Sequence, residues 1–296
     1  MKLSAISSLE RRSLPWIYFF LAPTLIMFLM FYLWPIVTVI YTSFTRWNGM
    51  SKAEWTGLAN FRRLFGMKSF LISLKNLGLW AAIAAVLHTL FGVMVALAFF
   101  KAPPGWKFVR TVFMIPNVIS GAAWAMIYRF FFNNDFGILN NIIRLFNQNF
   151  SVNWFFESPA AFWAITFTWL FYAVVITLVV LADLMAISSD IHEAAIIDGA
   201  TGWQITTRID LPLCRFSIGT SVIMGLSSRI SMYEAIALTS RGGPGDDTMS
   251  LSLILVKGIT DYNYGLANAV GMVMLILGAF AMLLCNRVFG MNSPVT

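Results

Sequence analysis

The sequence EAAIIDGATGWQITTRIDLP occupies residues 193–212 and separates two long apolar segments. It opens with the triplet Glu-Ala-Ala, has its first glycine at Gly199 and closes with Ile-Asp-Leu-Pro. A serine pair before it and acidic residues at its start favour a short helix over 190–197, because serine caps helices and carboxylates complement the helix dipole. Glycine then lets the backbone turn, and a second helical stretch is expected near 203–209. We therefore predict a compact projection that is suited to docking rather than to catalysis.

The rest of the chain has the composition of a membrane protein. Of its 296 residues, 59% are apolar and 11% are charged, and the mean hydropathy is +0.77. Soluble domains carry about 25% charged residues, and apolar runs longer than about 18 residues can cross a bilayer as helices. Backbone amides need internal partners in the bilayer, and this predicts an all-α membrane protein. We expect a single domain over 1–296 with six transmembrane helices, at about 15–43, 78–100, 108–132, 160–183, 214–239 and 265–288, and a loop at 184–213.

Composition also argues against several functions. The net charge is +7, but the basic residues are scattered through loops, as expected for anchors near lipid headgroups rather than for a nucleic-acid interface. Cys214 and Cys285 cannot form a disulfide framework, and His88 and His192 lie far apart without further ligands, so no metal site is expected. The sequence has no G-x-x-x-x-G-K-[ST] motif for binding ATP. No span carries paired catalytic residues, so an intramembrane enzyme is not favoured.

In this setting, the stretch over 193–212 resembles the EAA loop of binding-protein-dependent ABC importer permeases. The spacing Glu-Ala-Ala, three residues, Gly, nine residues, Ile, one residue, Leu-Pro is matched without a gap. The resemblance covers nearly the whole chain and is greatest to the sugar-type permeases of the maltose and glycerol-phosphate group. Further matching pieces follow the family's order: Trp34-Pro35, GLANF at 57–61, FMIPNVIS at 113–120, FGILN at 136–140 and SRGGPGDDT at 240–248.

The resemblance implies a fold like that of type I ABC importer permeases, with a cytoplasmic EAA coupling loop. It implies a permease subunit that moves a sugar or oligosaccharide into the cytoplasm by ATP-driven alternating access. The implied partners are a second homologous permease, a dimer of ATPase subunits and an extracytoplasmic solute-binding protein. ATP and Mg would bind the ATPase, so this chain would be no enzyme and would hold no cofactor.

The resemblance also implies an orientation in the bacterial cytoplasmic (inner) membrane, with the EAA loop and both termini on the cytoplasmic side. Basic residues do not decide this independently, because they are divided almost evenly between the two sides. Two alternatives stay open: 184–213 as an ordinary loop, and a stand-alone ion-coupled secondary sugar carrier. Such a carrier would need an inverted repeat and buried acidic residues that bind ions, and neither is evident.

The helix that starts near Glu193 is implied to sit in a cleft of the ATPase and to transmit its closure. We expect Glu193 to make the polar contact and three small residues to pack closely. Asp198 belongs to the same segment and is more simply explained as a local turn partner. The coupling residues are Glu193, Ala194, Ala195, Asp198 and Gly199.

Two charged residues lie inside the fifth apolar segment, Arg229 and Glu234. A charge at membrane depth costs about 2.5–3.5 kcal/mol on insertion scales, so it usually faces the bundle interior or an aqueous cavity. In the family, polar and aromatic residues about two turns before the Gly-Gly-Pro loop line the transport cavity, together with a face of the fourth span. The implied substrate path consists of Arg229, Tyr233, Ser228, Met232, Thr168, Phe171, Tyr172 and Glu234.

The charge of Arg229 leads to a prediction about the charge of the cargo. A guanidinium is a two-pronged donor that matches carboxylate or phosphate, which predicts an anionic cargo such as a uronate-bearing oligosaccharide or a phosphorylated polyol. The alternative is that Arg229 pairs internally, either with Glu234 or with a carboxylate of the partner permease.

Overall fold

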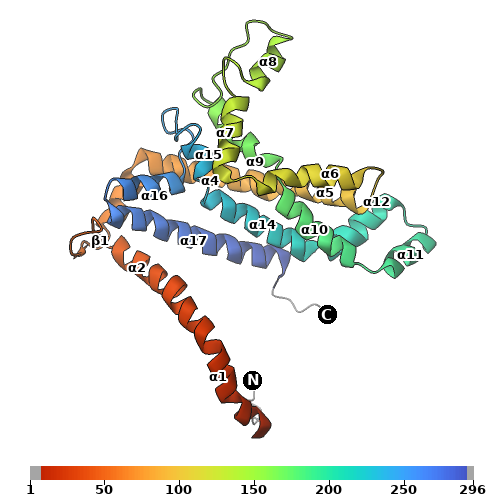
Figure 1. The fold of residues 1–296 in the computed structure, drawn as a ribbon, viewed down its shortest axis with the longest axis horizontal. Helices are drawn as coiled ribbons and strands as arrows, with labels where there is room; N and C mark the ends of the chain where they lie inside the picture. Colours follow the sequence, from red (N-terminus) through yellow and green to blue (C-terminus); the bar gives the residue numbers. More distant parts are fainter. Residues whose placement is uncertain (1–7, 292–296) are drawn as a thin grey trace.

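The computed structural model describes residues 8–291, with side chains from residue 16 onward. Helices make up most of this part (Figure 1). The strands in the described part form one short antiparallel hairpin, with Thr45 opposite Trp55. Its members are β1 (Thr45–Arg46) and β2 (Glu54–Trp55).

The first helix leans away from the other helices (Figure 1). It continues through a π turn that precedes Pro35, where proline removes a backbone donor. The stretch Trp16–Ser43 is apolar enough to cross a membrane, and none of its most apolar window is buried within the chain. Its pieces are α1 (Ser8–Phe28), η1 (Leu29–Leu33) and α2 (Trp34–Ser43).

Three further helical segments are long and apolar enough to span a membrane: Lys68–Phe100, Ala160–Ala186 and Tyr264–Phe289. The first begins well before the expected 78–100 and contains a π turn. The second is interrupted at 171–173. Their pieces are α4 (Lys68–Ile83), η2 (Ala84–His88), α5 (Thr89–Phe100), α9 (Ala160–Leu170), α10 (Val174–Ala186) and α17 (Tyr264–Phe289).

The helix expected over 108–132 is two pieces bent by 106°. Pro116 lies at the start of a 3-10 turn, where its missing N–H and its ring end the preceding helix. Ser120 then starts the next helix, because its hydroxyl accepts from the N–H of Ala123 at 3.3 Å. The pieces are α6 (Trp106–Met114), η3 (Ile115–Val118) and α7 (Gly121–Phe131).

The expected helix over 214–239 also differs, because it ends at Ile230 and resumes as a single turn. The carbonyl groups freed at the break find partners at the start of a later helix, α16 (Leu251–Thr260): Ser252 Oγ donates to Ile230 O at 2.8 Å, and Ser250 Oγ, from the residue that caps α16, donates to Met232 O at 3.1 Å. Upstream, the helix joins a short segment at an angle of 66°. The pieces are α12 (Gly202–Ile205), η4 (Thr206–Asp210), α13 (Leu211–Leu213), α14 (Arg215–Ile230) and α15 (Glu234–Ala237).

The described part therefore contains four helices that could each cross a membrane, or up to six if each bent pair is one span. This confirms the all-α membrane fold predicted from the sequence. The remaining short helices are α3 (Ala59–Gly66), α8 (Ile138–Arg144), α11 (Ser189–Ile197) and α16 (Leu251–Thr260).

The bundle packs α5 against α10, and α14 against both α10 and α17. Gly92 permits the close approach of α5 and α10, since Ile176 fills the space that a side chain at Gly92 would need. On the other side of the bundle, Trp80 stacks on Phe162 with ring centres 5.1 Å apart, and its indole N–H donates to Thr166 Oγ1 at 3.0 Å. These contacts hold the helices of the bundle together around the candidate sites.

Candidate functional site

Helix α11 projects from the bundle at the end opposite to the β hairpin (Figure 1). Ser188 begins it, because its hydroxyl accepts from the N–H of Asp190 at 3.3 Å. Of the nine residues of α11, all but His192 and Ala195 are exposed. The helix therefore presents almost its whole circumference to the outside.

The sequence-predicted coupling residues lie on and just after this helix. Glu193, Ala194 and Asp198 are exposed. Gly199 ends the segment with a φ of +80°, the left-handed conformation that favours glycine. Ala195 was expected to pack against the ATPase, but only 9% of it is exposed. It shares the inward face of α11 with His192, three residues earlier.

Asp198 has a local role as well. It follows the last residue of α11, and its N–H donates to Ala194 O at 2.9 Å. After the turn, Thr201 and Gln204 form a reciprocal capping box that starts α12. The bend predicted from glycine and polar residues is thus made by a left-handed glycine followed by a new helix cap.

His192 and Asp210 form a side-chain pair that the sequence analysis did not predict. Nε2 of His192 lies 2.8 Å from Oδ1 of Asp210, and the Asp210 side chain is only 5% exposed. The ring of Phe100, at the end of α5, lies against the imidazole with centroids 6.0 Å apart. The available signal was a pair of complementary side chains, one in the helix expected over 190–197 and one directly after the second stretch expected near 203–209.

A cavity of about 240 Å³ lies between α9, α10 and α14. The guanidinium carbon of Arg229 sits 4.0 Å from the centre of the Trp169 ring, and its Nη2 donates to Ser228 Oγ at 3.0 Å. Between residues 16 and 291, no carboxylate lies within salt-bridge distance of Arg229. The lining residues are His88, Trp169, Tyr172, Ala173, Val175, Ile176, Met224, Gly225, Ser228 and Arg229.

Trp169 is itself unusual, because its buried indole nitrogen has no hydrogen-bond partner in the described part of the chain. The other polar groups of the cavity wall are held in place. His88 Nδ1 lies 2.8 Å from Leu170 O, and the Tyr172 hydroxyl donates to Asn117 Oδ1 at 2.9 Å. The wall thus combines a cation held over an aromatic ring with side chains that are fixed by hydrogen bonds.

The structure brings together only part of the predicted substrate path. Ser228, Arg229 and Tyr172 line the cavity. Met232 lies close by, with its sulfur 3.7 Å from Nη1 of Arg229. Trp169 and His88 line it too, although neither was among the path residues expected from the sequence.

The other predicted path residues lie elsewhere. Thr168 is buried and donates to Ile165 O at 2.7 Å, and Phe171 packs on the rings of Phe91 and Phe167. Tyr233 packs against the buried apolar cluster. Glu234 is exposed and lies against Gly121 on α7 rather than against Arg229, so the internal Arg229–Glu234 pair is absent.

Both helices that supply the cavity are interrupted beside it. The fourth span breaks at 171–173 and the fifth at 231–233. Because of the second break, Met232 and Tyr233 do not continue the helix that carries Arg229. Discontinuous helices next to polar groups are typical of the binding sites of transporters.

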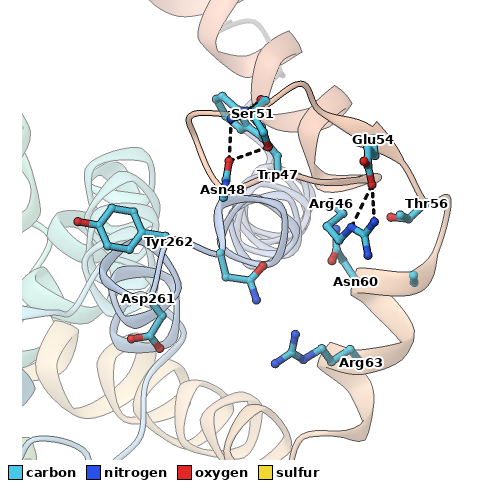
Figure 2. A pocket seen from close by; sticks show the side chains of 12 residues that line it. Arg46, Trp47, Asn48, Ser51, Glu54, Thr56, Asn60, Arg63, Asp261 and Tyr262 are labelled. Atoms are coloured by element: carbon cyan, nitrogen blue, oxygen red, sulfur yellow. Dashed lines mark hydrogen bonds and ion pairs between the residues drawn. The ribbon is translucent and has the colours of Figure 1, made fainter.

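A polar hollow of about 630 Å³ (Figure 2) lies beside the β hairpin, at the end of the bundle opposite α11 in Figure 1. Arg46 and Glu54 form an exposed ion pair across the β hairpin, with Nη2 and Oε2 2.5 Å apart. Figure 2 shows Arg63 on α3 and Asp261 on the opposite wall, and neither has a salt-bridge partner within residues 16–291. The hollow contains none of the site residues predicted from the sequence, and its lining is too polar for contact with lipid tails.

The chain is similar in sequence to transport proteins over most of its length. It is 30% identical over 267 residues to "Probable ABC transporter permease protein YesP" of Bacillus subtilis, covering 88% of this chain and 85% of that protein. The chain belongs to the ABC transporter permease family. No family model matches it.

Other relatives of this permease carry more specific names. It is 27% identical to "Probable starch degradation products transport system permease protein AmyD" of Thermoanaerobacterium thermosulfurigenes, over 88% of this chain and 90% of that protein. It is also 27% identical to "Trehalose/maltose transport system permease protein MalF" of Thermococcus litoralis, over 92% of each. The resemblance to sugar-type permeases is therefore confirmed, as is the prediction of a permease subunit rather than an enzyme. The alternative of a stand-alone ion-coupled carrier is not supported.

The fold agrees with solved structures. The permease superposes with a TM-score of 0.81 on a chain of a bacterial ABC transporter that imports the acidic polysaccharide alginate, at 23% identity and over 96% of this chain and 97% of that one. A second structure of a bacterial alginate ABC transporter, in complex with a periplasmic protein bound to an alginate pentasaccharide, gives a TM-score of 0.80 at 22% identity, over 94% of each chain. At these identities the similarity establishes the fold alone.

Proposed function

We propose that this permease is one of two transmembrane subunits of an importer that moves a sugar or oligosaccharide into the cytoplasm. The observation that carries the proposal is the set of relatives named for starch degradation products and for trehalose and maltose, each aligned over nearly the whole chain. The partners are a second permease, a pair of ATPase subunits and an extracytoplasmic solute-binding protein. The complex lies in the bacterial cytoplasmic membrane.

The ATPase docks on α11. This helix supplies what a docking element needs: an exposed carboxylate at Glu193, a small side chain at Ala194 and a sharp turn at Gly199 that ends it. Its projection supports an orientation with α11 in the cytoplasm and the hollow of Figure 2 on the outer side. An even number of spans then puts both termini in the cytoplasm.

The cavity beside Arg229 is one wall of the transport path. Its volume of about 240 Å³ is below the roughly 300–1,000 Å³ of closed small-molecule sites, as expected when a second permease completes the path. The breaks at 171–173 and 231–233 allow the halves of each span to move separately during alternating access.

The cargo is anionic. Arg229 holds a positive charge at membrane depth, and no carboxylate neutralises it within residues 16–291. Its guanidinium lies over Trp169, and its Nε and Nη2 both donate to the single hydroxyl of Ser228. A carboxylate or phosphate of the cargo can replace that hydroxyl and bind the guanidinium in two-pronged fashion. The ring of Tyr172, which also lines the cavity, offers a face on which a sugar ring can stack.

The test is uptake by liposomes that contain the assembled transporter, with neutral and uronate-bearing oligosaccharides of equal length as cargo. Arg229→Gln should lower uptake of the acidic cargo by about tenfold or more, as for a lost charged hydrogen bond of about 1.5–3 kcal/mol, and leave neutral cargo less affected. Unchanged uptake of the acidic cargo would refute the anionic assignment. An equal loss for both cargoes would instead indicate that Arg229 pairs with a carboxylate of the partner permease.

A further inference from the structure

We propose that the hydrogen bond between His192 and Asp210 is the rigid link that passes the displacement of α11 to α14. The proposal rests on the proposed function, in which the ATPase moves α11. It assigns positioning roles to two residues outside the expected set of Glu193, Ala194, Ala195, Asp198 and Gly199.

The attachment of α11 to the bundle is narrow. Only His192 and Ala195 on this helix turn inward, and Ala195 offers a single methyl group. Beyond the serine cap, the bond from His192 to Asp210 is the one side-chain hydrogen bond that α11 makes within the described residues. Apart from the backbone that joins α11 to its neighbours at either end, His192 makes the directional side-chain contact of this helix with the bundle, and a directional hydrogen bond resists displacement better than a methyl contact does.

Asp210 is placed to receive that force. It is the last residue of the π turn η4, and its side chain is almost fully buried. Its carbonyl accepts from the N–H of Cys214 at 3.0 Å, directly before α14 begins at Arg215. Helix α14 then runs without interruption to Ser228 and Arg229 at the cavity.

The link is also held laterally. The ring of Phe100, at the end of α5, lies against the imidazole of His192, and α5 packs on α10. A side chain confined on one face by an aromatic ring and at its tip by a buried carboxylate has little freedom to reorient. Motion of α11 is therefore carried into the α14 segment instead of being lost in side-chain rotation.

Four variants of the assembled transporter test this proposal. His192→Phe keeps the ring against Phe100 and removes the hydrogen bond. His192→Gln keeps a donor for Asp210. His192→Phe combined with Asp210→Leu removes both partners, so that no buried carboxylate is left unpaired. Glu193→Gln tests the proposed docking function separately.

Three quantities are measured on complexes that elute as assembled particles: bound ATPase subunit, ATP hydrolysis, and cargo taken up per ATP hydrolysed. His192→Phe should keep the ATPase bound and lower cargo per ATP by about 2- to 30-fold, the usual range for residues that carry coupling. His192→Gln should stay within about twofold of wild type, at the low end of that range. The double variant should regain thermal stability but not coupling.

The double variant separates a mechanical role from a merely structural one. If it restores cargo per ATP along with stability, the link is not needed and the proposal is overturned. Wild-type coupling in His192→Phe would overturn it as well, and so would loss of the ATPase from that variant. If Glu193→Gln also leaves ATPase binding and uptake unchanged, the proposal that α11 docks the ATPase is wrong. That outcome differs from one in which only the His192–Asp210 link proves unnecessary.

Discussion

The guanidinium of Arg229 lies 4.0 Å above the centre of the Trp169 ring, at a cavity whose wall also holds an indole N–H without a hydrogen-bond partner in the described residues. The ring orients the cation, whereas that N–H is itself buried and donates to nothing in the described residues. Arg229 has no acidic partner of its own between residues 16 and 291. On the function proposed above, such a site favours cargo that brings negative charge.

Trp169→Leu should weaken binding of the acidic cargo, because it removes the aromatic face that holds the Arg229 guanidinium. A cation over a desolvated aromatic ring is worth about 2 kcal/mol, so the half-saturating cargo concentration for uptake should rise about tenfold or more. Trp169 is buried, so the smaller side chain leaves a cavity and should also lower the melting temperature. Trp169→Phe is the control, because it leaves a cavity too but keeps a ring beneath Arg229, and it should retain more of the affinity. A Trp169→Leu variant that transports the acidic cargo with normal affinity would contradict this role.

Ala194→Trp should detach the ATPase. Ala194 is exposed on the outer face of α11, so the isolated permease tolerates a large side chain there, whereas a fitted cleft does not. Co-purification of the ATPase subunit is the readout. Ala279→Trp is the matched control, since Ala279 is exposed on α17, outside the segment that α11 belongs to, and should leave attachment unchanged. Equal recovery of ATPase with Ala194→Trp and with wild type would exclude this face from the interface.

Gly92→Val should loosen the contact between α5 and α10. A side chain at Gly92 overlaps Ile176, and overpacking of this kind costs about 1–3 kcal/mol. The expected result is a lower melting temperature in detergent, with partial recovery when Ile176→Ala is added. Gly78→Ala is the control, because nothing lies within 4 Å of the added methyl group. Failure of Ile176→Ala to compensate would mean that the two helices do not meet at this point.

Ser250→Ala and Ser252→Ala should destabilise the break in the fifth span. Each hydroxyl satisfies a carbonyl oxygen that the interrupted helix leaves free, on Met232 and Ile230 respectively. Loss of the donor to a buried acceptor costs about 1–3 kcal/mol, and the effect should appear in both thermal unfolding and uptake. Thr260→Val, at the exposed end of α16, is the control, because its hydroxyl donates to a carbonyl oxygen of its own helix. Wild-type melting of both serine variants would show that water or lipid already satisfies these carbonyls.

The coupling segment was predictable because its signals are local. Serine before the helix and glycine after it act within a turn of their own positions, and the structure places Ser188 and Gly199 at those boundaries. The partner of His192 was not predictable in the same way. Asp210 lies 18 residues away, and only the fold of the intervening bend brings the two together.

The substrate path was harder to predict because apolar composition does not reveal breaks within a span. The interruption at 231–233 is stabilised by hydroxyl groups of Ser250 and Ser252, about twenty residues further along the chain. The interruption at 171–173 likewise changes which face of the fourth span meets Arg229. Trp169, Tyr172 and Ile176 line the cavity, whereas the neighbouring residue Thr168 is turned into the interior.

The most direct test of the central claim is cargo uptake by liposomes that contain the assembled transporter and its binding protein, with and without ATP on the α11 side. We predict that uptake requires ATP, is unaffected by proton or sodium gradients, and is abolished by Ala194→Trp. Uptake driven by an ion gradient without ATP, or undiminished ATP-driven uptake by that variant, would contradict it.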